Sequence, residues 1–212
     1  MKCTLCHTPL SQAMDSYYFN CHTCRALIKN KEHYLSDEAE KATYELHNND
    51  VNDIRYRKFV SPITTYISEN YTKKTLGLDF GCGAAPVVTT MLKEQGFDIK
   101  PYDPYFCCDT EYLNHRYDYI VCCEVAEHFH YPATEIEKLI GLLKSAGELI
   151  IHTMLYHNGI AFKNWHYRRD DTHVIIYTKE TMEYIASMHQ LSITKMDGRL
   201  IVLKKGRNNS CP

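Results

Sequence analysis

The sequence has 212 residues, of which 44% are hydrophobic and 24% charged, a composition typical of one globular domain with an attachment. A formal net charge of -2 and a pI near 6.6 give no general attraction to nucleic acid, and no apolar run is long enough to span a membrane. Because the N-terminus does not begin a signal peptide, we expect a soluble, cytoplasmic protein whose ten cysteines form no disulfide framework.

The chain begins with two Cys-x-x-Cys pairs separated by fourteen residues, formed by Cys3, Cys6, Cys21 and Cys24. Four thiolates at this spacing can bind one tetrahedral Zn²⁺. A segment this short has little apolar core of its own, so a bound metal would supply much of its stability. We therefore predict a zinc-binding segment over residues 1–30. Its role should be structural, because four cysteines leave no open coordination position; the alternative is four reduced, unliganded cysteines.

Residues 31–74 are predicted to form a helical connector that covers a ligand pocket as a lid. Asp37 with Glu40 resembles a capping box and indicates the start of one helix. A second helix should run through Tyr56 and Phe59, and Pro62 is expected to restart it after a break.

Residues 75–86 predict a buried strand, a glycine turn and the start of a helix, with the turn at Gly81-Cys82-Gly83. A dinucleotide-binding turn would have a third glycine where this chain has Pro86. The acidic residue Asp79 stands two positions before the first glycine. A carboxylate there would repel a pyrophosphate, but it could hold the α-ammonium group of an amino-acid-containing ligand, directly or through water.

Further strands follow at regular intervals. A strand over residues 97–102 ends at Asp103, where a carboxylate can bind two ribose hydroxyls, and a strand over residues 117–123 leads into Glu124. A helix, another strand and a helix beginning near Thr178 come next. A closing hairpin is predicted over residues 191–203.

The pattern Asp79-x-Gly81-x-Gly83 resembles motif I of the class I S-adenosylmethionine-dependent methyltransferases, and the other motifs follow in family order between residues 44 and 205. The resemblance implies a Rossmann-like α/β three-layer sheet, mostly parallel, with a C-terminal antiparallel hairpin and strand order 2-1-4-5-7-6. The methyltransferase domain would cover residues 75–206, with a flexible tail at 207–212. Only thirteen residues separate Asp103 from Tyr117, so we expect the family's third strand to be missing or vestigial.

The resemblance also implies S-adenosylmethionine as cofactor. The residues expected to bind it are Asp79, Gly81, Cys82, Gly83, Tyr102, Asp103, Pro104, Asp109 and Glu124. Asp109 would supply an acidic contact to the adenine. Alternatively, Tyr102, Pro104, Tyr105 or Phe106 would pack on the purine.

The segment Glu124-x-x-Glu127-His128 resembles the metal-binding segment of ubiquinone-pathway O-methyltransferases and of small-RNA ribose methyltransferases. The resemblance implies that the carboxylates and the imidazole, with His173 or His152 downstream, hold Mg²⁺ or Mn²⁺ against the acceptor. The alternative is that His128 acts as a plain base without a metal. The expected catalytic residues are Glu127, His128 and His173.

The insertion around Trp165-His166-Tyr167 resembles small bacterial methyltransferases related to the ubiquinone-pathway enzymes, and Tyr44, His47 and Tyr56 are candidates for lid residues. We therefore expect methyl transfer to a small-molecule acceptor, with oxygen favoured as the accepting atom. One alternative is an RNA methyltransferase that uses the zinc segment for recognition. Another is a non-enzymatic scaffold that keeps the cofactor fold.

Overall fold

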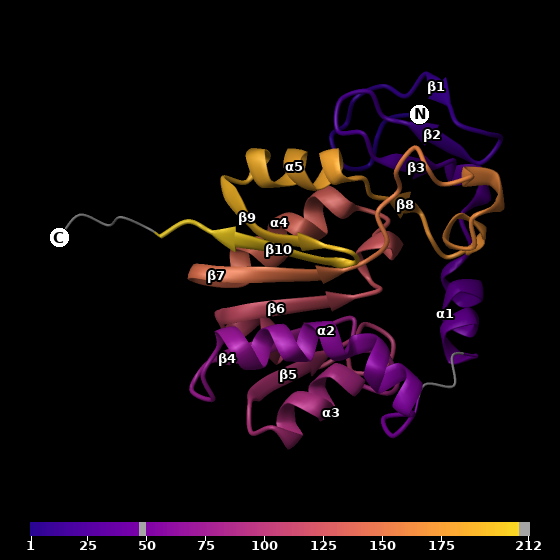
Figure 1. The fold of residues 1–212 in the computed structure, drawn as a ribbon. Coiled ribbons are helices and arrows are strands. Elements are labelled where there is room, and N and C mark those ends of the chain that lie inside the picture. Colours follow the sequence, from indigo (N-terminus) through magenta and orange to yellow (C-terminus); the bar gives the residue numbers. More distant parts are fainter. Residues whose placement is uncertain (47–49, 208–212) are drawn as a thin grey trace.

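A six-stranded sheet forms the centre of the computed structural model, which describes residues 1–46 and 50–207 (Figure 1). Its strands in spatial order are β5 (Asp98–Tyr102), β4 (Leu76–Phe80), β6 (Tyr117–Cys123), β7 (Leu143–His152), β10 (Leu200–Lys205) and β9 (Leu191–Asp197). The strands β5, β4, β6 and β7 pair in parallel, whereas β10 pairs antiparallel with both β7 and β9. The predicted order, mostly parallel sheet and closing hairpin are confirmed. Residues 208–212 of the predicted tail and the lid candidate His47 lie outside the described residues.

The segment between β5 and β6 has too few residues for the helix, strand and helix that the predicted fold would otherwise place there. Its described residues form the short 3-10 helix η2 (Thr110–Asn114) and no named strand. The prediction of a missing third strand is therefore confirmed.

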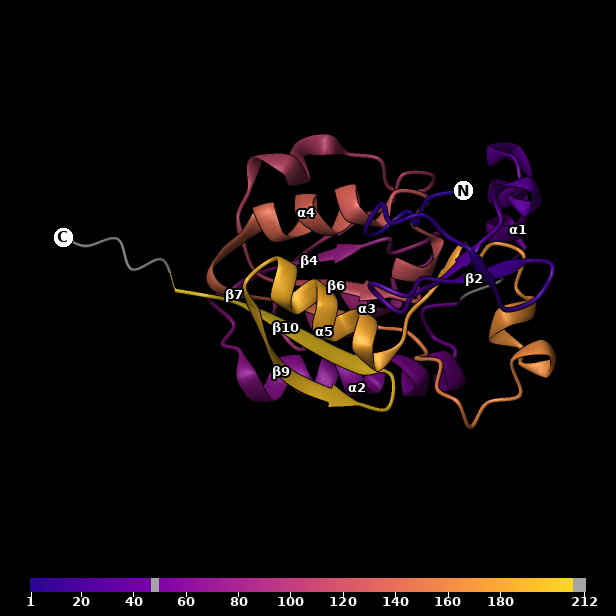
Figure 2. The ribbon, with the colours of Figure 1, turned by 90° about the horizontal axis from the view of Figure 1, so that it is seen from above.

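Alternating side chains on the strands form two apolar layers, because successive residues of a strand point to opposite faces. Tyr119 and Val121 of β6 pack in one cluster with α2 (Ile54–Asn70) and α3 (Val87–Glu94). The alternate residues, Ile120 and Cys122, pack with α4 (Pro132–Leu142) and α5 (Lys179–Met188). The view from above places α2 and α4 on opposite sides of the sheet (Figure 2). The result is the expected three-layer arrangement.

Helix α2 continues through Pro62, so the predicted break and restart at this position were wrong. Proline lacks the N–H that would bond the carbonyl four residues earlier. In α2 the hydroxyl of Ser61 donates to that carbonyl, on Lys58, at 2.8 Å. The side chain therefore satisfies the acceptor that the proline leaves unpaired. None of the helices in the described chain is long and apolar enough to cross a membrane.

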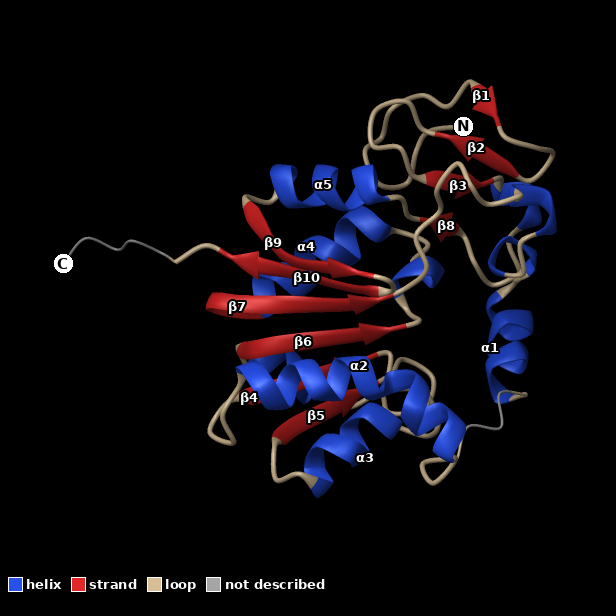
Figure 3. Cartoon of the chain, viewed as in Figure 1, coloured by secondary structure: helices blue, strands red, loops and turns tan. Residues whose placement is uncertain are grey.

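The N-terminal residues 1–29, which we call the cysteine module, build a second sheet beside the end of the first (Figure 3). This sheet has the order β1 (Gln12–Ala13), β2 (Tyr18–Asn20), β3 (Leu27–Lys29) and β8 (Ile175–Ile176). Because β8 belongs to the insertion after β7, the start of the chain is joined to a segment near its end. The helix α1 (Asp37–Glu45) follows the module and is capped by Ser36, not by Asp37. The remaining 3-10 helices are η1 (Lys31–His33), η3 (Ala126–His128), η4 (Phe162–Asn164) and η5 (Tyr167–Arg169).

Candidate functional site

A cavity of about 730 Å³ lies at the carboxyl ends of β4, β5 and β6. Loops at this edge of a parallel sheet carry the ligand sites of open α/β folds. The glycine turn, the loop after β5 and the loop after β6 line one part of the cavity. The helix α1 and the insertion after β7 line the other part.

The glycine turn allows a close backbone approach at two positions. Gly81 and Gly83 have φ angles of +78° and +67°, in the left-handed region that residues with a side chain rarely adopt. A Cβ on Gly81 would lie 2.5 Å from a methyl group of Val125, whereas a Cβ on Gly83 would meet no atom within 4 Å. Cys82 between them also lines the cavity, and burial raises the pKa of its thiol. The turn therefore packs against Val125 at Gly81 and has open space beside it at Gly83.

Asp103 joins the glycine turn to the loop after β5. Its Oδ2 accepts the backbone N–H of Gly83 at 3.0 Å, and its Oδ1 accepts the N–H groups of Tyr105 and Phe106 at 2.8 and 3.1 Å. The carboxylate lines the cavity, as do Tyr102 and Pro104. Asp103 therefore fixes the shape of both loops while it faces the ligand space.

Two acidic residues expected to contact the ligand lie elsewhere in the described chain. Asp79 is 2% exposed and outside the cavity lining, and its Oδ2 accepts from the backbone N–H and the hydroxyl of Thr89 at 3.1 and 2.7 Å. It therefore stabilises the first turns of α3 from behind the glycine turn. Asp109 is exposed, caps η2 and also lies outside the lining. The residues predicted as the alternative adenine contacts line the cavity, namely Tyr102, Pro104, Tyr105 and Phe106.

Burial raises the pKa of Asp79 to about 6 from an ordinary value of 3.8. In the unfolded chain Asp79 loses its proton near its ordinary pKa, whereas in the folded protein it does so only near pH 6. Ionisation of Asp79 therefore destabilises the fold; the full cost is present above about pH 6 and disappears as the pH falls toward 4. Asp79→Asn should therefore raise the free energy of unfolding at pH 7.5 by about 2 to 3 kcal/mol. Thermal unfolding at pH 7.5 and 4.5 tests this, with exposed Asp98→Asn as control. A stabilisation equal at both pH values would contradict it.

Glu124, directly after β6, has a left-handed φ of 51° and lines the cavity. Its Oε1 lies 3.3 Å from Nδ1 of His152 and 3.5 Å from the guanidinium of Arg199. Arg199 comes from the turn between β9 and β10 and also stacks over Phe59, 5.1 Å from the ring centre. His152, one of the two expected downstream partners, is therefore paired with Glu124, the first carboxylate of the expected metal-binding segment, and neither residue belongs to the group of metal-ligand side chains formed by Glu127, His128 and His173.

Three side chains converge beside the cavity, namely Glu127, His128 and His173. One ligand-type atom from each lies within 4.8 Å of the other two. Glu127 is fully buried, and its carboxylate accepts hydrogen bonds from the hydroxyls of Tyr167 and Thr153. Both histidines line the cavity, whereas the buried Glu127 is not among the residues that line it. Of the two downstream histidines considered, His173 is the one that the fold brings to this cluster.

The backbone fixes the proton positions of both imidazoles. Nδ1 of His128 lies 3.1 Å from the carbonyl of Thr172, and Nδ1 of His173 lies 2.7 Å from the carbonyl of Tyr167. Because a carbonyl only accepts, each Nδ1 carries a proton and each Nε2 keeps a lone pair in the neutral ring. Burial lowers the pKa of His173, which favours this neutral form. The cluster thus offers two basic nitrogens and a carboxylate.

The remaining walls of the cavity are aromatic and acidic. Tyr44 of α1 and Tyr56 of α2, both lid candidates, line it, and Glu40 of α1 accepts from the Tyr44 hydroxyl at 2.6 Å and lies 3.2 Å from Nε2 of His130. The carboxylates in the lining are Asp37, Glu40, Asp103, Glu124, Glu135 and Asp170, against the cations Lys138 and Arg199. This excess of negative charge favours a positively charged ligand. The sequence offered no functional signal for Arg199, which lies within the hairpin predicted over residues 191–203.

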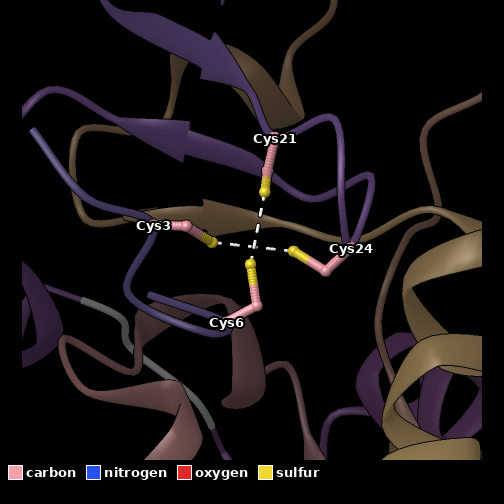
Figure 4. A group of neighbouring side chains, drawn as sticks. All are labelled: Cys3, Cys6, Cys21 and Cys24. Atoms are coloured by element: carbon pink, nitrogen blue, oxygen red, sulfur yellow. Dashed lines mark hydrogen bonds between the residues drawn. The ribbon is translucent and has the colours of Figure 1, made fainter. Parts of the chain in front are cut away.

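The four cysteines of the module point their sulfurs at one common centre (Figure 4). The sulfurs of Cys3 and Cys24 lie 3.6 Å apart, and those of Cys6 and Cys21 lie 3.3 Å apart. Four thiolates around Zn²⁺ would be about 3.8 Å apart, so only a small expansion separates this arrangement from a tetrahedral site. The hydrogen bond between the Cys3 and Cys24 thiols lowers the pKa of Cys3.

Both Cys-x-x-Cys pairs have the same backbone shape. The N–H of His7 donates to the carbonyl of Cys3, and the N–H of Arg25 donates to the carbonyl of Cys21, at 3.0 and 2.9 Å. His7 and Arg25 also share φ angles of 61° and 62°. Since both side chains are exposed, neither packing nor burial accounts for these left-handed residues. The two matching turns present each pair of thiols to the same point, which fits a metal site.

Comparison with protein families gives a match to a family model described as a methyltransferase domain, over residues 53–195. The fold is similar to that of 1,6-didemethyltoxoflavin-N1-methyltransferase from Burkholderia thailandensis, with 12% identity, a TM-score of 0.58, and coverage of 93% of this chain and 100% of that one. It is also similar to magnesium protoporphyrin IX methyltransferase from Synechocystis PCC 6803, with 12% identity, a TM-score of 0.54, and coverage of 80% and 94%. Both of those crystal structures contain S-adenosylhomocysteine. Comparison with curated protein sequences gives no significant match.

Proposed function

Because this chain belongs to the methyltransferase-domain family, we propose that it transfers a methyl group from S-adenosylmethionine to an oxygen atom of a small-molecule acceptor. The observation that carries the proposal is the hydrogen bond between Gly83 and Asp103, which joins the two cofactor loops of the fold at the cavity edge. The relatives from Burkholderia and Synechocystis, named for small-molecule acceptors and crystallised with S-adenosylhomocysteine, support the same donor.

The residues of the cavity fit this cofactor. The space beside Gly83 leaves room for the methionine part, and we propose that Asp103, which lines the cavity, binds the ribose. The excess of carboxylates suits the positive sulfonium. Tyr102, Pro104, Tyr105 and Phe106 are the residues that we propose to pack against the adenine. S-adenosylmethionine supplies an activated methyl group, so the protein mainly has to align the acceptor and remove a proton.

The cluster of Glu127, His128 and His173 is suited to handle that proton. His128 lines the cavity and its Nδ1 is bound by the carbonyl of Thr172, so we assign its Nε2 as the base that accepts the acceptor's proton. Glu127, held by Tyr167 and Thr153, would stabilise the positive charge that develops on the imidazoles. The same three groups also fit a divalent cation such as Mg²⁺ or Mn²⁺, which would lower the pKa of an acceptor hydroxyl.

The charge of the cavity favours a small molecule over RNA, because its carboxylates would repel phosphates. The proposal can be tested with extracts of cells that lack the gene, incubated with the protein and S-adenosylmethionine carrying a labelled methyl group. Label should enter the low-molecular-mass fraction. Label confined to RNA or protein would refute the small-molecule acceptor. Absence of label from every fraction, with S-adenosylhomocysteine still bound, would support a non-enzymatic scaffold.

We propose zinc as the ligand of Cys3, Cys6, Cys21 and Cys24, supported by the two matching turns and the four converging sulfurs. Elemental analysis should find about one zinc per chain. Replacing Cys21 and Cys24 together by serine should remove it, whereas Cys107→Ser with Cys108→Ser should not, because those cysteines lie outside the cluster. Metal-free wild-type protein, purified without chelators, would contradict the assignment.

A further inference from the structure

The cysteine module is built into the wall of the cavity through the segment that carries His173. Strand β3 of the module pairs antiparallel with β8, which begins two residues after His173. The N–H of Lys29 extends this pairing by donating to the carbonyl of Val174 at 2.9 Å. Figure 1 shows the module and the insertion side by side, at the end of the central sheet where the strands finish. The two segments therefore form one structural unit.

Two buried side chains of the module donate hydrogen bonds into the backbone of residues 170–174. The hydroxyl of Tyr18, which is 0% exposed, donates to the carbonyl of His173 at 2.7 Å. The ammonium group of Lys29, which is 2% exposed, donates to the carbonyl of Asp171 at 2.7 Å. Burying a lysine is costly unless its charge is well compensated, and among residues 1–46 and 50–207 the only carboxylate within ion-pair distance, that of Asp171, is 3.8 Å away. The carbonyl of Asp171 is thus the main hydrogen-bond partner of the buried Lys29 ammonium group.

The same stretch of backbone carries His173 and orients the imidazole of His128. Thr172, between the two residues held by the module, supplies the carbonyl that binds Nδ1 of His128. Val174 donates its N–H to the carbonyl of Glu127 at 3.0 Å, which ties the stretch to η3. A shift of this backbone would therefore move His173 directly and would release the ring of His128.

We propose that the cysteine module is the positioning element of the acceptor site, with Tyr18 and Lys29 as positioning residues for His128 and His173. The two residues fix the backbone of residues 170–174, which carries His173 and binds Nδ1 of His128, and both histidines line the cavity. The four-cysteine site keeps β2 and β3 in place, so its integrity is required for the geometry of a cluster built from distant residues. The inference rests on the proposed function only for the chemical use of the two imidazoles.

The test uses full-length Tyr18→Phe and Lys29→Met, with Tyr17→Phe and Lys2→Met as controls, because both control side chains are exposed in the same module. Zinc content and the Kd for S-adenosylhomocysteine should stay within about twofold of wild type in all four variants. Amide exchange of residues 170–175 should become about tenfold faster in Tyr18→Phe and Lys29→Met only. In ¹⁵N spectra of the imidazoles, the signals of His128 and His173 should shift or broaden in the same two variants. These signals are assigned with His128→Gln and His173→Gln.

Unchanged imidazole signals in Tyr18→Phe would overturn the proposal, even if Lys29→Met failed to fold. Loss of S-adenosylhomocysteine binding in Tyr18→Phe would also overturn it, because the hydroxyl would then support the fold in general. A wild-type protein that binds no S-adenosylhomocysteine, but shows the expected imidazole changes in both variants, would contradict the proposed function and support the positioning role.

Discussion

Asp103→Ala is expected to weaken the binding of S-adenosylmethionine by about 100-fold, because one carboxylate holds both the glycine turn and the loop after β5. Its loss would leave the N–H groups of Gly83, Tyr105 and Phe106 without their acceptor. The turn and the loop after β5 would then have to be ordered by the ligand itself. Any hydrogen bonds from Asp103 to the ribose would be lost as well. Isothermal titration with S-adenosylmethionine and with S-adenosylhomocysteine measures the effect.

The matched control is Asp109→Ala, which removes an acidic side chain from the same loop but outside the cavity lining. We expect this variant to bind the cofactor with nearly the affinity of the wild type. Equal affinities for Asp103→Ala and wild type would refute the cofactor site. A large loss in Asp109→Ala would instead restore the acidic adenine contact that the sequence suggested.

Glu127→Gln and His128→Gln are each expected to lower the rate of methyl transfer by about 10² to 10⁴-fold, the usual contribution of a positioned acid or base. Cofactor binding should survive in His128→Gln, since Nδ1 of the ring is bound by the carbonyl of Thr172 in the insertion and not by either loop that Asp103 holds. The measurement is the initial rate of label transfer to the small-molecule fraction at saturating S-adenosylmethionine. His157→Gln, which changes an exposed histidine outside the cavity lining, serves as the control.

A chelator separates the two possible roles of this cluster. If His128 is a plain base, activity persists in EDTA under conditions that leave zinc on the four cysteines. If the cluster holds Mg²⁺ or Mn²⁺, activity disappears in EDTA and returns with either ion. Full activity of His128→Gln in both conditions would refute both roles.

The central sheet could be predicted because its signals are local. Adjacent apolar residues such as Tyr119 and Ile120, which point to opposite faces, indicate a strand buried on both faces, and Gly81 and Gly83 indicate the turn. The break at Pro62 was predicted from the same kind of signal and was wrong, because the compensating hydroxyl of Ser61 is invisible to a rule about proline alone. Local rules therefore describe elements better than the exceptions within them.

The candidate site depends on contacts between residues far apart in sequence, which no local pattern encodes. Asp79 was expected to contact the ligand, yet its carboxylate accepts a hydrogen bond from the hydroxyl of Thr89. Arg199 reaches the cavity only because β10 pairs with β7 and brings its turn beside Glu124. The choice of His173 over His152 likewise required the three-dimensional position of the insertion.

The pairing of β3 with β8 has a consequence for the order of folding during synthesis. The two turns that hold the four cysteines close within residues 3–25, whereas the contact between Tyr18 and His173 joins residues that are 155 positions apart. The small sheet therefore stays incomplete until translation has passed Ile176, and closing such a long loop is slow. During that interval, a metal bound early to the nascent chain would keep β3 ordered until β8, the strand that pairs with its edge, has been synthesised.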